Sequence, residues 1–162
     1  MKYLIVFTLL IAANAFAKTD AKAEANIFNE AEKAIASGNI KVLEKDLAAG
    51  YDPNSVLSGA GETPITLAAI NGQPKVIELL VQKGANIDQQ LIGGDTALML
   101  AARANSFGKN AGKSTETKGH IAVVETLLKL GADKTITDRK GLTALDIAKG
   151  AHNQEIAKLL SK

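Results

Sequence analysis

The chain has 162 residues, the size of one domain or of a short array of repeats. Hydrophobic residues make up 46% and charged residues 22%, which is typical of a globular protein and excludes disorder over most of the length. The formal net charge is only +2 and no long basic run occurs, which argues against a nucleic-acid surface. Cysteine is absent and there are two histidines, so we expect no disulfide, no metal site and no cofactor.

The N-terminus has the pattern of a secretory signal peptide. Lys2 supplies a positive charge, residues 3–13 form an uncharged apolar run, and residues 15–17 (Ala-Phe-Ala) match the small-x-small cleavage site. The apolar run is about half the length that a bilayer span needs, which argues against the alternative of an uncleaved anchor. We expect a signal peptide at 1–17, a flexible polar leader at 18–25, export to the periplasm and no stable membrane insertion after cleavage.

The rest of the chain repeats itself. Residues 61–69 (GETPITLAA) recur as 94–102 (GDTALMLAA) and as 141–149 (GLTALDIAK). A second apolar block follows each copy. The first two of these blocks end on Gly-Ala, at 84–85 and 131–132, and the last stops at 156–160. Sequence blocks that recur along a chain in this way are typical of repeat architectures.

These blocks resemble the ankyrin repeat over residues 26–162. The resemblance implies an all-α solenoid of helix–turn–helix repeats with short hairpin loops, in which each repeat completes its core by stacking on its neighbours. The recurring blocks predict four repeats, at 26–58, 59–92, 93–139 and 140–162. The first and the last act as caps.

The residues at the helix ends fit this fold. Thr63, Thr96 and Thr143 are suitable N-caps for the first helix of three repeats, and Pro64 suits the first helical position. His152 stands where the turn between the last two helices needs glycine, and we expect it to adopt a positive φ there.

Two further expectations concern packing. The histidine that the family pattern places after Thr-Pro-Leu is replaced by Thr66, Met99 and Asp146, which puts the hydrogen bonds of that position in doubt. Four leucines are expected to be buried between repeats: Leu79, Leu80, Leu127 and Leu128.

An insertion at 105–118 separates the two helices of the third repeat. Its Gly, Ser, Asn, Thr and Lys content predicts a loop rather than an added helix. Loops of this length are either functional or mere decoration, and both interpretations stay open. Only three residues separate Gly108 from Gly112, so the segment does not meet the spacing of a phosphate-binding loop.

The resemblance implies a binding surface rather than an enzyme, because no catalytic set can be assembled from this chain. In ankyrin arrays the hairpin tips and the inner helices grip another protein, and the insertion borders that face. The candidate partner-binding residues are therefore Tyr51, Glu62, Ile70, Asn71, Asp95, Arg103, Phe107, Lys109, Lys113, Arg139 and Lys140.

The expected compartment narrows the partner. The chain resembles exported bacterial ankyrin proteins, a class that includes immunity proteins which protect the cell against its own wall-cleaving peptidases. The sequence thus predicts a protein that is monomeric when free and inhibits a periplasmic peptidoglycan hydrolase, such as a DD-endopeptidase or carboxypeptidase. The alternative is a non-inhibitory scaffold or accessory factor for periplasmic stress proteins such as catalase.

Overall fold

The computed structural model describes residues 29–103 and 114–162, with side chains from residue 119 onward in the second range. The expected signal peptide at 1–17 and leader at 18–25 lie outside the described residues. So do three of the candidate contacts, Phe107, Lys109 and Lys113.

Helices account for the regular structure, and the described residues contain no strand. A helix at 29–37 comes first. It is followed by α2 (Ile40–Ala48), α3 (Pro64–Ile70), α4 (Pro74–Gln82), α5 (Ala97–Arg103), α6 (Ser114–Lys129), α7 (Ala144–Gly150) and α8 (Gln154–Leu160).

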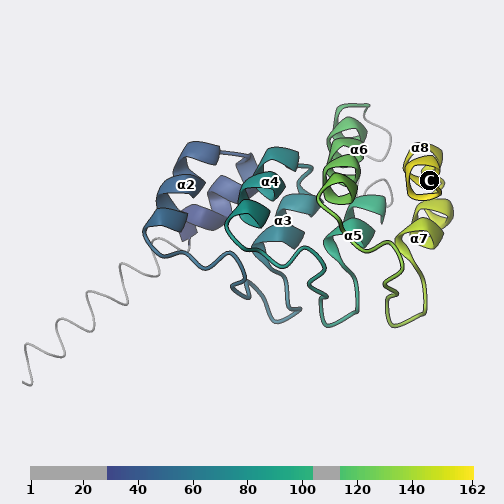
Figure 1. The fold of residues 1–162 in the computed structure, drawn as a ribbon, viewed down its shortest axis with the longest axis horizontal. Helices are drawn as coiled ribbons and strands as arrows, with labels where there is room; N and C mark the ends of the chain where they lie inside the picture. Colours follow the sequence, from purple (N-terminus) through teal and green to yellow (C-terminus); the bar gives the residue numbers. More distant parts are fainter. Residues whose placement is uncertain (1–28, 104–113) are drawn as a thin grey trace, which may run out of the picture.

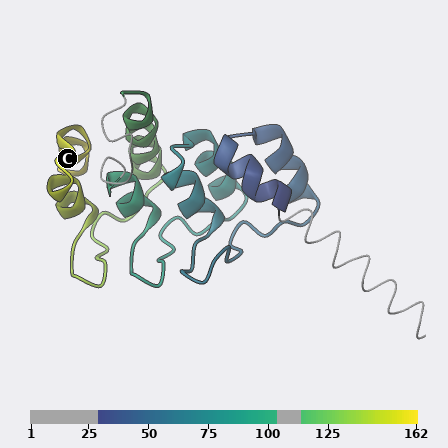
Figure 2. The ribbon, with the colours of Figure 1, turned by 180° about the vertical axis from the view of Figure 1, so that it is seen from behind.

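The helices form two parallel rows (Figure 1). One row contains α3, α5 and α7, and the other contains α2, α4, α6 and α8, with contacts between neighbours in each row and between the two helices of each repeat. Hairpin loops project together from one side, as both views show (Figures 1 and 2). The predicted all-α repeat solenoid is confirmed.

The helix starts follow the local rules that the sequence suggested. Thr63 and Thr143 have extended backbone angles just before α3 and α7, and Pro64 and Pro74 occupy the first turns of α3 and α4. Proline is tolerated there because the first N–H groups of a helix have no partner within the helix. The predicted N-caps Thr63 and Thr143 and the predicted position of Pro64 are confirmed.

In two repeats another side chain makes a hydrogen bond at the position where the family pattern has histidine. The Oγ1 atom of Thr66 accepts a hydrogen bond from the N–H of Thr63 at 2.8 Å, and Oδ2 of Asp146 accepts one from the N–H of Thr143 at 3.0 Å. Met99 carries no such acceptor. A side-chain oxygen three residues into the helix therefore satisfies the N-cap N–H group in the second and fourth repeats.

The turn between α7 and α8 confirms the prediction for His152, whose φ is 56°. Gly38 and Gly72 occupy the same turn of the first and second repeats with φ values of 73° and 66°. A histidine at positive φ is uncommon, but its side chain is less restrictive there than a β-branched one.

The structure corrects the extent of the predicted loop 105–118, because α6 begins at Ser114 and residues 114–118 are helical. The prediction was wrong because serine and threonine, which suggested a loop, are also favoured at helix starts. Gly119 lies inside α6, where an added Cβ would come 3.1 Å from the carbonyl oxygen of Gly72. Glycine here lets α6 pass close to the turn of the preceding repeat.

Apolar side chains from both rows form one core. Leu79, Leu80 and Leu127 are buried as predicted, but Leu128 is only half-buried. Counted from the Gly-Ala pairs, Leu127 is in register with Leu80, whereas Leu128 is in register with Val81, which is also half-buried. The Leu-Leu pair thus sits one position later in the third repeat, which moves its second leucine toward the edge of the core.

Backbone hydrogen bonds join the hairpins of neighbouring repeats. The N–H of Ile92 donates to the carbonyl of Ala60 at 3.0 Å, and the N–H of Arg139 donates to the carbonyl of Gly93 at 3.2 Å. At Gly94, where φ is 85°, an added Cβ would come 2.9 Å from the nitrogen of Arg139. This close stacking holds the hairpin tips in a row along one face of the array.

Candidate partner-binding groove

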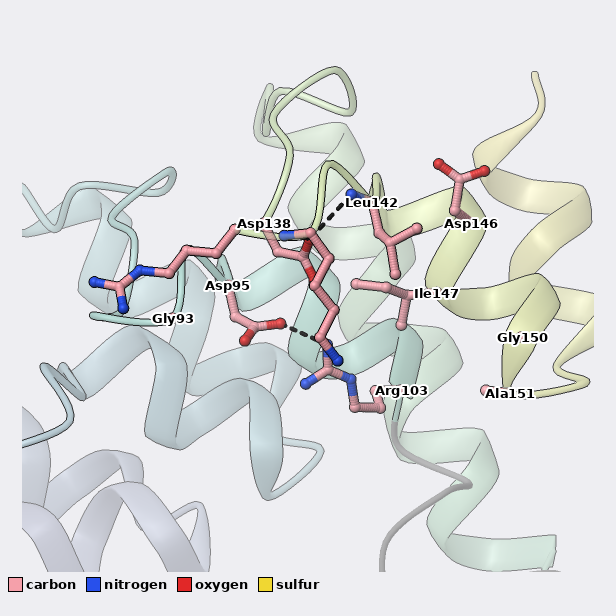
Figure 3. A pocket seen from close by; sticks show the side chains of 11 residues that line it. Gly93, Asp95, Arg103, Asp138, Leu142, Asp146, Ile147, Gly150 and Ala151 are labelled. Carbon is pink, nitrogen blue, oxygen red and sulfur yellow. Dashed lines mark hydrogen bonds and ion pairs between the residues drawn. The ribbon is translucent and has the colours of Figure 1, made fainter.

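A hollow of about 620 Å³ lies between the last two hairpins and the inner row of helices (Figure 3). It combines the C-terminal end of α5, one side of α7 and the tips of two hairpin loops. The residues that line it are Gly93, Asp95, Arg103, Asp138, Arg139, Lys140, Leu142, Asp146, Ile147, Gly150 and Ala151. We call this hollow the groove; it contains four of the predicted contact residues.

An ion pair forms one wall of the groove. The Nη2 atom of Arg103 lies 2.7 Å from Oδ1 of Asp95, with the two side chains 26% and 16% exposed (Figure 3). Arg103 is the last residue of α5 and Asp95 belongs to the hairpin before that helix. The pair therefore fixes the hairpin against the helix, and both predicted contacts have a structural role.

The carboxylates of the fourth repeat are hydrogen-bonded to their own hairpin and helix. Oδ1 of Asp138 accepts from the N–H groups of Lys140 at 2.8 Å and Leu142 at 2.9 Å. The bond from Leu142 is the main cause that lowers the pKa of Asp138. For Asp146 the hydroxyl of Thr143, at 2.6 Å, is the main cause that lowers its pKa. Both side chains are thus kept ionised and occupied by local donors.

The two cations at the hairpin tip, Arg139 and Lys140, face solvent. Within the described part of the chain neither takes part in a salt bridge. Their charges are available to a group entering from outside, while the nearby carboxylates are already engaged.

The floor of the groove is apolar. Leu142 is 38% exposed and Ile147 is buried beneath it. Gly150, the last residue of α7, is in register with Ile70 of α3 and Arg103 of α5, which carry large side chains. A Cβ added at Gly150 would meet nothing within 4 Å. The hollow is therefore open at the position where the two preceding repeats carry a large side chain.

The remaining candidates in the second repeat lie at the surface. Ile70 is 42% exposed, and its carbonyl oxygen lies 2.9 Å from Nε2 of His120 in the next repeat. Asn71 is exposed and donates a hydrogen bond from Nδ2 to the carbonyl of Leu67. Glu62 is partly exposed. These positions stay predictions as contacts.

Tyr51 corrects the predicted site. It was expected to touch a partner, but only 6% of it is exposed and it belongs to the core. It follows Gly50 as Ala85 follows Gly84 and Ala132 follows Gly131, and both alanines are buried. The repeat register was the signal that identifies it as a core residue. Burial is also the main cause that raises the pKa of the Tyr51 phenol.

The prediction included Lys140 and placed Leu142 at the same hairpin tip, but it omitted the groove-lining residues of α7, among them Ile147 and Gly150. Comparison of the repeats position by position would have found Gly150, because Ile70 and Arg103 stand at that position in the two preceding repeats. In the described ranges no group of His, Asp or Glu is arranged to hold a metal ion. No described helix is both long and apolar enough to cross a membrane.

Stacked helix pairs with a row of hairpins and an open groove define a repeat solenoid that binds other proteins through its surface. Residues 32–138 match the family model for ankyrin repeats, in three copies, and the chain belongs to this family. Ankyrin repeats are protein-binding modules.

The curated relatives are much longer proteins. The chain is 35% identical over 117 residues to ankyrin repeat and SAM domain-containing protein 6 of Rattus norvegicus, which covers 70% of this chain and 11% of that protein. It is 40% identical over 97 residues to SH3 and multiple ankyrin repeat domains protein 1 of Homo sapiens, covering 59% of this chain and 4% of that protein. The similarity therefore concerns the repeats and not the rest of those proteins.

Proposed function

We propose that this protein is exported to the periplasm and binds a cell-wall peptidase there, blocking its active site as an immunity or self-protection protein. The proposed enzyme is a peptidoglycan hydrolase of the DD-endopeptidase or DD-carboxypeptidase type. Two features support the proposal: the signal-peptide pattern at 1–17 and membership of a family of protein-binding modules.

The observation that carries the proposal is the exposed row along the inner helices and hairpins. Ile70 exposes a large apolar side chain at the end of α3, and the groove continues the row at α5 and α7. Large apolar side chains near the centre of an interface contribute most when water is excluded around them. A partner that covered this row would bury Ile70 together with the groove.

The test is inhibition of purified DD-endopeptidases and DD-carboxypeptidases from the same periplasm, measured as release of D-alanine or of cleaved cross-links. We expect stoichiometric inhibition by the wild-type protein. Ile70→Lys should raise the concentration required for half-inhibition at least tenfold, because a buried charge without a partner opposes binding. Ala48→Lys is the matched control, since Ala48 is exposed and is likewise the last residue of its helix, α2.

The outcomes separate the alternatives. If saturating wild-type protein leaves every one of these peptidases active, inhibition is refuted. A stable complex with a periplasmic enzyme that keeps its activity would then favour the scaffold or stress-accessory function. If the wild type inhibits and Ile70→Lys inhibits equally well, the function stands and the second repeat is not part of the contact.

A further inference from the structure

We propose that the groove between the third and fourth repeats binds an extended segment of the partner in which a large apolar side chain lies next to aspartate or glutamate. This inference rests on the proposed function and names the chemistry that the partner must present. It follows from three properties of the groove: its apolar floor, two exposed cations that form no salt bridge with the described residues, and the engagement of its own carboxylates.

The volume and floor select an apolar side chain. A hollow of about 620 Å³ is larger than any single side chain and is floored by Leu142 and Ile147. Gly150 leaves open space above that floor. Removing the exposed part of Leu142 from water together with a Leu, Ile, Met or Phe side chain of the partner is favourable, since the gain scales with the apolar area buried.

The charges select an acidic neighbour. Asp95 is paired with Arg103, and Asp138 and Asp146 accept hydrogen bonds from their own loop and helix. Each of these carboxylates therefore already has a donor at one of its oxygens before a partner arrives. Arg139 and Lys140 at the rim have no salt bridge within the described residues, so a carboxylate held about one or two residues from the apolar side chain would complement them.

The backbone argues for an acidic side chain rather than a C-terminal carboxylate. Terminal carboxylates are usually captured by backbone N–H groups arranged as a nest. Here the N–H groups of Lys140 and Leu142, which face the hairpin turn, already donate to Asp138. What remains at the rim is a pair of flexible side-chain cations, which suits an Asp or Glu within a continuous segment.

The experiment is a selection of random dodecapeptides, displayed with both ends blocked, on the full mature protein. We expect enrichment of one large apolar residue with Asp or Glu within two positions. Arg139→Glu combined with Lys140→Glu should turn the selection toward Lys or Arg at that neighbouring position. Enrichment without acidic residues, the same preference in the charge-reversed protein, or no enrichment at all would overturn the inference.

A second variant adds an apolar side chain to the lining of the groove without disturbing the backbone. Gly150 does not require a positive φ and its Cβ direction is open, so Gly150→Leu is compatible with the end of α7. Its thermal melt should match that of the wild type or lie above it, because leucine favours helix over glycine. Binding of a selected peptide, measured by fluorescence anisotropy, should weaken at least tenfold, since the space for the apolar side chain is lost.

Two controls make this contrast specific. Ala48→Leu, the control for Gly150→Leu, adds a similar side chain at the exposed end of α2 and should leave peptide binding unchanged.

The cations are tested in the same way. Arg139→Ala with Lys140→Ala should weaken binding about threefold to tenfold, less so at high salt, because exposed charge pairs are screened. Lys75→Ala with Lys83→Ala removes two exposed cations from α4 and its C-cap and should have no effect. Equal loss in both double variants would refute a local role for Arg139 and Lys140.

Failure of this inference is distinguishable from failure of the proposed function. If Gly150→Leu inhibits the wall peptidase as well as the wild type, the groove is not the contact and the function stands. If acidic-apolar peptides bind the groove and no wall peptidase is inhibited, the groove is a peptide site and the inhibitory function fails.

Discussion

Replacing Leu80 by alanine tests whether the stacked repeats share one core. Leu80 lies on α4, has no exposed surface and belongs to the cluster that extends from the first helix to α8. The substitution removes three buried carbon atoms, worth about 2.4 kcal/mol at about 0.8 kcal/mol each. The cavity left behind adds about 1 kcal/mol. We therefore expect the free energy of unfolding to fall by about 3–4 kcal/mol.

The matched control is Leu142→Ala, because Leu142 is 38% exposed at the groove. Its loss should stay below about 2 kcal/mol, since more than a third of this side chain is already in water. Urea unfolding followed by circular dichroism gives both values at an unchanged m-value. A loss below about 1 kcal/mol for Leu80→Ala, or one no larger than that of the control, would refute the packing that this structure assigns to α4.

Three further predictions concern export, hairpin stacking and acid stability. Intact-mass measurement of the periplasmic fraction should find a mature N-terminus at Lys18; a membrane-retained, full-length species would contradict this. In the same urea melts, Gly94→Ala should lower the free energy of unfolding by about 1 kcal/mol or more beyond the loss caused by Gly131→Ala. Both residues have positive φ, but only a Cβ added at Gly94 meets a neighbour, the nitrogen of Arg139 at 2.9 Å. Equal losses would mean that the hairpins separate easily. The hydroxyl of Thr143 lowers the pKa of Asp146 below its ordinary value of 3.8. The stability from this carboxylate is therefore present above that value and is lost as pH falls through the lower, folded-state pKa. Asp146→Asn should reduce the dependence of the urea midpoint on pH in this acid range, and an unchanged dependence would show that Asp146 contributes nothing to it.

Features that depend on a few consecutive residues were predictable from the sequence. Threonine before a helix, proline in its first turn and a residue at positive φ between helices follow from local hydrogen bonding and backbone sterics, so Thr63, Pro64 and His152 were placed correctly. The repeated blocks then predicted the fold, because helix pairs that are apolar on one face complete their cores by stacking on the neighbouring pairs.

Features that depend on the neighbouring repeat required the tertiary structure. The start of α6 at Ser114 was missed because serine and threonine suit both loops and helix starts, and the approach of Gly119 to Gly72 is visible only in space. Tyr51 looked like a surface aromatic, yet the packing around its Gly-Ala register position buries it.

The groove itself is a tertiary feature. Arg103 and Asp95 were each predicted as partner contacts, but their 2.7 Å pairing depends on how α5 meets its hairpin. The charges of Arg139 and Lys140 are evident in the sequence; that the adjacent carboxylate of Asp138 is occupied by its own hairpin is not. The sequence determined the repeats and their caps through local preferences, whereas the hollow beside Gly150 forms only when two repeats and their hairpins are stacked around it.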